Sequence, residues 1–452
     1  MSSSHIDLTK EVGSIVQSAA ERARDSGRPV LATVAVPSPE SDPFALLSEP
    51  SSFWWSQPGL SVAGTTPVAQ SLAAGSGRFI DLSVGLRKVF DSQVNAGREP
   101  LAFAGASFGH QPLEGEWASF PVAAAWVPER AIVTEGSERW LVVSSVVRAS
   151  DGEAEVAEHM VASLEAPPLA SAPPPVARVA DKGAYSPSDT AYQGSISEAL
   201  DLISRDELQK VVLARRLRLE AAVPPSPAEL ATALSTRYPD AFGYAIVRDH
   251  AAFIGASPEL LVETDGDTVR AAPAAGTVAG TPSEVENRRL AGGLDTPKSR
   301  WEQELVTDAV YFALEPFCDR VSGHLPMVVA AGPVQHLSAE IEGILRQPVS
   351  VLELAGALHP TPAVGGVPEE TALAFIREAE GFERGWYAGP VGIVRADGSG
   401  TLAVALRGAL VRDGSVALFA GAGIVHGSVP EDEQREVDMK LATVMSVLSL
   451  GS

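Results

Sequence analysis

The second half of the chain opens with a helical apolar pattern that leads into a strand. Four apolar residues recur at the spacing of one helix face: Tyr192, Ile196, Leu200 and Ile203. Residues 208–214 then form a nearly continuous apolar run of strand length, which is typical of a buried strand. The pattern therefore predicts a helix followed directly by a buried strand.

Three strand-like runs and a final helix are predicted nearer the C-terminus. The runs cover residues 389–395, 401–411 and 415–421. Asp-Gly pairs separate them, and such pairs supply the positive φ of tight hairpin turns, so we expect an antiparallel meander. The last helix begins at Pro430 beside three acidic residues, and its apolar stripe consists of Val437, Leu441, Met445 and Leu448.

The first half of the chain also has strand-like composition. Residues 121–135 and 139–148 are rich in Val, Ala, Ile and Trp and are bounded by Gly, Asp and Ser, which indicates strands with helices between them. A proline-rich connector over residues 166–184 separates residues 1–165 from residues 185–452. Strands paired by hairpins, with helices grouped around them, favour an α+β fold over a doubly wound parallel sheet.

Composition narrows the class of protein. The chain has 452 residues, 34 Lys and Arg against 57 Asp and Glu, and a formal charge of −23. That charge has the wrong sign for binding nucleic acid, and no apolar run reaches the roughly 18 residues of a membrane span, so we expect neither partner. The charged N-terminal segment argues against a signal peptide, and Cys318 alone forms neither an internal disulfide nor a thiolate metal site. We therefore expect a cytoplasmic protein.

Three charged residues lie in surroundings that favour chemistry. Lys210 begins an otherwise apolar run in which desolvation disfavours its ammonium form, so it is either a base or a lysine at a sheet edge. Glu259 has hydrophobic neighbours, so it is either a protonated general acid or a strand-end residue that faces water. Arg407 shares a strand face with Ala403 and Ala405, where it has room either to bind a carboxylate or to form a structural ion pair.

Acidic residues on two predicted helices can share a hard cation. Glu302 lies in a helix that begins at about residue 301, and Glu433, Glu436 and Lys440 share one face of the C-terminal helix. Mg²⁺ prefers oxygen ligands and needs only one or two carboxylates, although a solvated face of ion pairs is the alternative interpretation. The eight histidines lack the spacing of zinc ligands.

A glycine-rich segment, 421–424, is predicted to be a loop before the last helix. It superficially resembles a dinucleotide fingerprint, but it lacks the βαβ context and the acidic residue that this fingerprint requires. Backbone amides that hold a smaller anion are the better interpretation.

Eight motifs in order, between about residues 185 and 450, resemble those of the chorismate-utilising enzymes, the family that includes isochorismate, salicylate, anthranilate and aminodeoxychorismate synthases. The motifs are KVVLAR at 210–215, GASPELLV at 255–262, AAGT at 274–277, KSRWEQEL at 298–305, HPTPAVGG at 359–366, WYAGPVGIV at 386–394, ALRGALV at 405–411 and GAGIV at 421–425, and the acidic helix that ends at Lys440 follows them. The resemblance implies a large α/β sandwich of mostly antiparallel sheets flanked by helices, formed as one composite domain.

The resemblance also implies a role for each candidate residue. Lys210 matches the base that activates water, at a position where ammonia-using members usually carry glutamine, and Glu259 matches the acid that protonates the departing C4 hydroxyl. Glu302 and Glu436 match Mg²⁺ ligands. The groups implied to bind the substrate are the amides of Gly276 and Gly421, the side chains of Arg407 and Lys440, and the pocket residues His359, Ala363 and Val364.

Two positions depart from the family pattern. Ser299 stands three residues before Glu302, where relatives often have an acidic residue, and Gln303 replaces a common histidine. The corresponding acidic pair on the last helix, Glu433 and Glu436, is intact. We therefore expect either weaker metal affinity or a water in place of the missing carboxylate.

The implied activity is the Mg²⁺-dependent, reversible conversion of chorismate to isochorismate by a monomer, for menaquinone or siderophore synthesis. Salicylate synthase, which also eliminates pyruvate, is the alternative, and Ala363 and Val364 favour stopping at isochorismate. A chorismate-binding protein without activity is suggested only by Ser299 and by the divergent N-terminal region. The presence of all four predicted catalytic and metal-binding residues argues against it.

Overall fold

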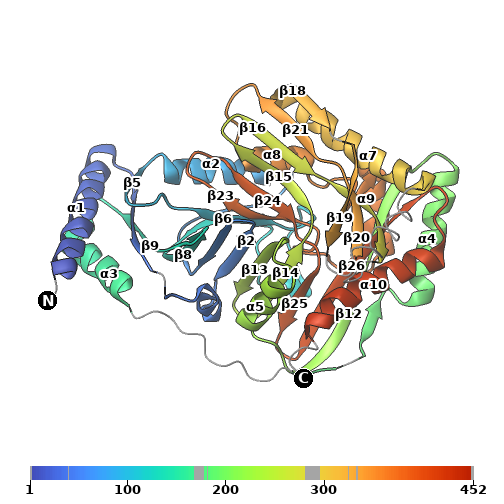
Figure 1. The fold of residues 1–452 in the computed structure, drawn as a ribbon, viewed down its shortest axis with the longest axis horizontal. Coiled ribbons are helices and arrows are strands. Elements are labelled where there is room, and N and C mark those ends of the chain that lie inside the picture. The colour runs from blue at the N-terminus through green and yellow to red at the C-terminus, as the bar shows by residue number, and fades with distance from the viewer. Residues whose placement is uncertain are drawn as a thin grey trace.

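Two large, mostly antiparallel sheets and one small sheet organise the chain (Figure 1). The structure is a computed structural model, and it describes residues 3–38, 40–166, 178–180, 182–279, 296–323, 325–331 and 334–448. Among the described strand pairs, only β1 (Val30–Pro37) and β5 (Gln93–Ala96) run parallel to each other. This arrangement, with helices flanking the sheets, confirms the predicted α+β fold.

The larger sheet has fourteen strands within the described residues, and its main path runs β10-β12-β26-β25-β14-β13-β2-β3-β8-β9-β1-β5, with β11 and β22 paired to β12 beside it. The remaining bounds are β2 (Phe53–Gln57), β3 (Leu60–Gly64), β8 (Arg130–Glu135), β9 (Glu138–Val147), β10 (Arg178–Val179), β11 (Ala184–Ser186), β12 (Lys210–Val223), β13 (Phe242–Arg248), β14 (Ala251–Ser257), β22 (Gly366–Val367), β25 (Gly408–Arg412) and β26 (Ser415–Val425). Strands from both sides of the predicted connector share this sheet. Most of the connector itself lies outside the described residues, and the proposed domain limits stay a prediction.

The second sheet has nine strands among the described residues, in the order β18-β21-β16-β15-β24-β23-β6-β7-β4, and a small sheet has the order β17-β20-β19. The strands are β4 (Pro67–Ala73), β6 (Ala102–Ala106), β7 (Ala123–Pro128), β15 (Leu260–Asp265), β16 (Thr268–Ala272), β17 (Ala274–Ala279), β18 (Cys318–Gly323), β19 (Met327–Ala331), β20 (Val334–Ser338), β21 (Ile341–Leu345), β23 (Pro390–Val394) and β24 (Gly400–Val404). Strands β7, β8 and β9 confirm the strand-like composition of the first half.

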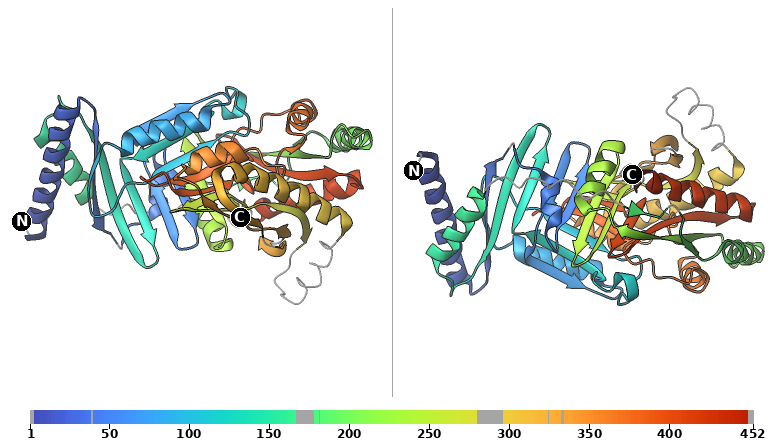
Figure 2. Two further views of the ribbon diagram at one scale, coloured as in Figure 1. Left: turned by 90° about the horizontal axis from the view of Figure 1, so that it is seen from above. Right: turned by 90° about the horizontal axis from the view of Figure 1, so that it is seen from below.

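Helices cover both ends of the elongated molecule. They are α1 (Ser3–Ser26), α2 (Arg78–Phe90), α3 (Glu153–Glu165), α4 (Asp189–Ser204), α5 (Pro227–Arg237), α7 (Pro297–Leu314), α8 (Val351–Leu358), α9 (Glu369–Ala379) and α10 (Pro430–Leu448), with short 3₁₀ turns η1 (Pro43–Ser48), η2 (Gly115–Trp117) and η4 (Glu315–Phe317). Figures 1 and 2 place α1 and α3 together at the end that carries the N-terminus, far from α10. None of the described helices is long and apolar enough to cross a membrane.

Alternating residues of β12 face two different apolar cores. Leu213 and Leu217 belong to the core beneath α4 and α10, together with Ile196 and Leu441. Ala214 faces the other way, into the core between the two large sheets. Because side chains of a strand alternate between its faces, helices cover one face of β12 and leave the other face for the interior of the sandwich.

The structure confirms some predicted elements and corrects others. The predicted helices at residues 192–203 and from Pro430 are α4 and α10. The helix predicted from residue 301 begins earlier, at Pro297, because Thr296 accepts a hydrogen bond from the backbone amide of Ser299 and caps it.

Two predictions for residues 401–424, a strand and a loop, are wrong. The run 401–411 is divided into β24 and β25, which belong to different sheets, so residues 389–421 form two hairpins instead of one meander. Residues 405–407 make the crossing, and Arg407 has a φ of 53°, which ends the strand alternation from which its direction was predicted. The glycine-rich segment 421–424 is no loop, because it lies inside β26 and pairs with β12.

Candidate active site

A cavity, whose empty space of about 640 Å³ includes open solvent, lies where β12, β26, α7 and α10 meet the segments around residues 259, 276 and 407. The predicted site residues that line it are Glu259, Gly276, Glu302, Ala363, Val364, Arg407, Gly421, Glu436 and Lys440. These residues come from elements far apart in the sequence, so the fold brings nearly all of the predicted site together at one place.

Lys210 reaches the cavity through a buried ion pair with Glu302. The distance from its Nζ to Glu302 Oε1 is 3.0 Å, and the two side chains are 1% and 9% exposed. Gly423 makes this contact possible, since a Cβ there would lie 2.1 Å from Glu302 Oε1 and 3.0 Å from Lys210 Cε. The close approach of the ion pair therefore requires a glycine at position 423, near the end of β26, where the sequence showed only a glycine-rich segment.

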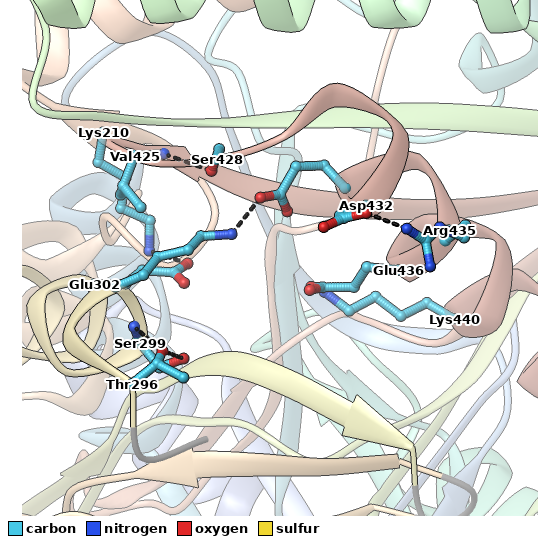
Figure 3. A network of polar contacts seen from close by, with 12 residues as sticks. Lys210, Thr296, Ser299, Glu302, Val425, Ser428, Asp432, Arg435, Glu436 and Lys440 are labelled. Atoms are coloured by element: carbon cyan, nitrogen blue, oxygen red, sulfur yellow. Dashed lines mark hydrogen bonds and ion pairs between the residues drawn. The ribbon is translucent and has the colours of Figure 1, made fainter. Parts of the chain in front are cut away.

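Three carboxylates at the junction of α7 and α10 each pair with a lysine (Figure 3). Besides Lys210 and Glu302, the Nζ of Lys440 lies 2.7 Å from Glu436 Oε1 and donates to the carbonyl of Gly421 at 2.8 Å. Lys298 pairs with Glu433, so an ion pair joins α7 to α10. Burial raises the pKa of Glu433, although Lys298 opposes this effect.

Glu259 lies between β14 and β15 with its carboxyl in the cavity wall. Its backbone amide donates to Ser257 Oγ at 3.2 Å, and its carbonyl accepts from the amide of Val404 at 3.1 Å, so β14 and β24 hold it. Burial raises the pKa of Glu259 to about 7, even though Lys210 and Lys440 act in the opposite direction. This carboxyl can therefore hold a proton near neutral pH.

Arg407 is positioned by the crossing between the two large sheets. The hydroxyl of buried Tyr244 donates to the carbonyl of Leu406 at 2.9 Å and fixes the backbone just before Arg407. Burial lowers the pKa of Arg407, an effect that Tyr387 and Glu436 oppose. Tyr387 itself lines the cavity and stacks on Phe419, with ring centroids 5.3 Å apart, and the sequence had not indicated either aromatic residue.

The two departures from the family pattern have clear structural roles. Ser299 bonds to the helix-capping Thr296, both through its backbone amide and through its hydroxyl at 2.9 Å. Gln303 is buried, and its Oε1 accepts from the amide of Ala275 at 2.9 Å while its Nε2 donates to the carbonyl of Pro273 at 3.2 Å. Gln303 thus holds the segment that precedes Gly276 against α7.

His359 lies outside the cavity lining, and its contact with the substrate stays a prediction. Its Nε2 lies 3.1 Å from the carbonyl oxygen of Phe108, and its ring packs edge-on against Phe79 and Phe108. Burial, aided by Arg78, lowers the pKa of His359 to about 3, so the ring is neutral. The residue packs the 359–366 segment onto the N-terminal half of the chain.

The donors available for a metal ion are the carboxylates of Glu302 and Glu436. Both line the cavity, and in the described part of the chain no group of three or more His, Cys, Asp or Glu side chains is placed to hold a metal. Mg²⁺ commonly binds through one or two protein carboxylates and takes its other oxygens from substrate and water. The donor set therefore fits the predicted cation.

Comparison with known proteins identifies the family. A model of the chorismate binding enzyme family matches residues 17–449. The chain belongs to this family. It is 31% identical over 439 residues to the salicylate biosynthesis isochorismate synthase of Pseudomonas aeruginosa, a match that covers 95% of this chain and 92% of that protein.

Two further proteins, both named isochorismate synthases, are also similar to this chain. The isochorismate synthase MenF of Bacillus subtilis is 32% identical over 358 residues, covering 77% of this chain and 74% of its own length. The solved structure of MenF, the menaquinone-specific isochorismate synthase from Escherichia coli, aligns with a TM-score of 0.77 and 25% identity over 96% of this chain and 99% of that chain. This match agrees with the fold that the resemblance implied. Isochorismate synthases of the family are in general metal-dependent.

A buried ion pair that the sequence did not indicate supports the cavity of this family member. Arg384 donates to Glu380, to the carbonyl of Val212 at 2.8 Å and to the carbonyl of Val364 at 2.7 Å. Glu380 Oε1 accepts from the amide of Ala214 at 2.7 Å. The pair therefore holds the segment with Val364 beside β12. Its only sequence signal is the i, i+4 spacing of two opposite charges.

We expect Arg384→Met to destabilise the fold by about 3–5 kcal/mol, because Glu380 would remain as an uncompensated buried charge. Urea unfolding measures this change. Arg435→Met is the matched control, since its partner Asp432 is exposed and such pairs contribute little. Equal stability of the two variants would show that the buried pair does not support the fold.

Proposed function

We propose that the chain is an isochorismate synthase, which interconverts chorismate and isochorismate by adding water at C2 and releasing the C4 hydroxyl. The relatives described above carry this activity in their names. The observation that carries the proposal is that Glu259, whose pKa is raised to about 7, lines the same cavity as Glu302, the ion-pair partner of Lys210. A base for water and a protonated acid for the leaving group are the two groups that this reaction needs.

Lys210 and Glu259 divide the proton transfers between them. Neutral Lys210 takes a proton from water as its oxygen bonds to C2, while Glu259 gives a proton to the C4 hydroxyl, which leaves as water. In the reverse direction the Glu259 carboxylate takes a proton and the Lys210 ammonium gives one.

The substrate is a dianion, and the formal charge of −23 opposes its approach. We infer that the cationic side chains of Arg407 and Lys440 overcome this field locally, since both line the cavity. The amide of Gly276, whose φ is 68°, is a further donor for a substrate carboxylate.

Glu302 and Glu436 are proposed to hold Mg²⁺. A bound Mg²⁺ supplies positive charge that neutralises the ring carboxylate of the substrate. Lys210 and Lys440 pair with these same carboxylates, so the cation and the two ammonium groups compete for one set of oxygens. Because Ser299 takes the place of a second carboxylate on α7, Glu436 carries a larger share of the binding than it would in a four-carboxylate site.

Chromatography of the products formed from chorismate tests the proposed activity directly. With Mg²⁺, and without ammonia, the purified chain should give isochorismate in equilibrium with chorismate and little salicylate. Salicylate and pyruvate in equal amounts would move the assignment to salicylate synthase. If no metal-dependent product formed, the remaining interpretation would be a protein that binds chorismate without converting it.

Lys210→Ala should lower kcat by about 10²–10⁴-fold, the usual contribution of a general base, while chorismate still binds. Turnover assays and equilibrium binding of chorismate measure the two effects. Lys10→Ala, at an exposed position on α1, is the control and should retain full activity. If the Lys210 variant turned over at the wild-type rate, another group would be the base.

The pH dependence of kcat/KM should report the carboxyl of Glu259. With a pKa of about 7 it loses its proton above that pH, so the slope of log kcat/KM against pH should decrease by about one as the pH passes 7. Glu431→Gln, at an exposed site on α10, should keep this change of slope, whereas Glu259→Gln should lose most activity at every pH. A profile with no change of slope near pH 7 would exclude Glu259 as the acid.

Glu436→Gln should raise the Mg²⁺ concentration needed for half-maximal activity by at least about tenfold, because an amide oxygen is a weaker ligand than a carboxylate. Titration of activity with Mg²⁺ measures the shift. The exposed Glu431 of the same helix provides the control substitution Glu431→Gln. An unchanged titration in the Glu436 variant would remove this residue from the metal site.

A further inference from the structure

A second, solvent-open cavity, whose empty space of about 700 Å³ includes open solvent, lies on the same sheet face as the active cavity, farther along β12 and β26. Its lining residues are Glu116, Arg216, Arg218, Arg412, Asp413 and Ser415. Val212 of β12 lines the active cavity, and strand side chains alternate, so Arg216 and Arg218 project from the same face as Val212. We call this second space the arginine cavity.

Strand register explains why the arginine cavity is open. Arg218 pairs with Ala417 of β26, and Ala417 pairs in turn with Leu410 of β25, two residues before Arg412. Directly opposed residues of antiparallel strands share a face, so the small side chain of Ala417 lies between the two strands that carry the arginines. Because the side chain of Ala417 is small, space for a ligand remains between the guanidinium groups.

The polar groups of the arginine cavity leave positive charge available. Glu116 pairs with Arg216 at 2.7 Å, and Arg412 donates to the carbonyl of Gly115 at 3.3 Å. Among the described residues, no carboxylate forms an ion pair with Arg218 or Arg412. Exposed Asp413 also borders the cavity, and its charge limits the affinity for anions.

Arg216 also has a donor that is not used. Its Nε is buried and makes no hydrogen bond within the described part of the chain. Buried donors of native proteins are nearly always paired, so this N–H points to a ligand oxygen as its partner. Arginine presents its donors in a planar fork that matches carboxylate and phosphate groups.

A layer of aromatic rings separates the two cavities. The guanidinium carbon of Arg216 lies 5.5 Å from the ring centre of Phe382, and the rings of Phe382 and Phe419 are 6.0 Å apart. Phe419 lines the active cavity and stacks on Tyr387 there. An anion in the arginine cavity therefore lies behind Phe419 and cannot occupy the substrate's place.

We propose that the arginine cavity binds a small dianion that carries carboxylate or phosphate groups, at a site separate from the active cavity. Glu116 balances the charge of Arg216, so Arg218 and Arg412 hold the ligand, and Asp413 reduces the net charge of the lining to one positive charge. The dianion accepts hydrogen bonds from these two side chains and from Nε of Arg216. This proposal does not depend on the proposed activity, because binding alone tests it.

Isothermal titration calorimetry of the full chain with inorganic phosphate and, separately, with succinate tests the proposal. The wild type should bind the probe in the arginine cavity, and Arg218→Gln/Arg412→Gln should weaken that binding by about tenfold or more. The matched control is Arg407→Gln, which removes a guanidinium from the active cavity and should leave this binding unchanged. The probe that binds more tightly identifies phosphate or carboxylate as the preferred group.

Asp413→Asn keeps the test independent of misfolding, because removal of a repulsive charge should strengthen binding by several-fold. A damaged fold cannot produce that gain. Three outcomes would overturn the proposal: no binding of either anion, binding that the double arginine variant leaves intact, and binding that Arg407→Gln abolishes, which would place the anion in the active cavity.

Discussion

Eleven registered residue pairs, from Lys210↔Val425 to Glu220↔Ser415, hold β12 against β26. One face of this pair is covered by α4 and α10, and the other face carries both the active cavity and the arginine cavity. A slip of one residue would turn every side chain to the opposite face, placing Lys210 under the helices and apolar residues in the cavities. The packing of apolar residues beneath α4 and α10 therefore determines which side chains of the same strands face the two cavities.

The active cavity concentrates opposite charges in a small buried volume. Lys210, Lys298 and Lys440 each meet a carboxylate, so the three pairs are neutral in total even though the chain is strongly acidic. Buried ion pairs gain little net stability, because desolvation offsets their attraction. We infer that these pairs allow one partner to be replaced. An entering cation or substrate carboxylate can take the place of one member of a pair, and the charge of the other member stays compensated.

Local patterns in the sequence predicted the elements that depend on local physics. The stripes of α4 and α10 and the buried start of β12 were confirmed, and the ordered motifs indicated the family that the comparisons identify. The break at residues 405–407 was missed because small and apolar residues alternate across it as they do within a strand. The place of His359 in the core and the contacts of Gln303 and Arg384 depend on segments distant in sequence. The spacing of apolar residues along the chain gives no information about such contacts. The roles of the individual site residues stay proposals.

The order of the site elements along the chain has a consequence for biosynthesis. A ribosome delivers β12 and Glu259 long before it delivers Gly423, Glu436 and Lys440, so the emerging chain holds Lys210 without the strand that will pair with it. Pairings between such distant segments form late, since loop closure costs entropy before any contact is gained. A nascent chain of this protein therefore has no complete active cavity until β26 and α10 have been synthesised, and Lys210 lacks its β26 partner until then.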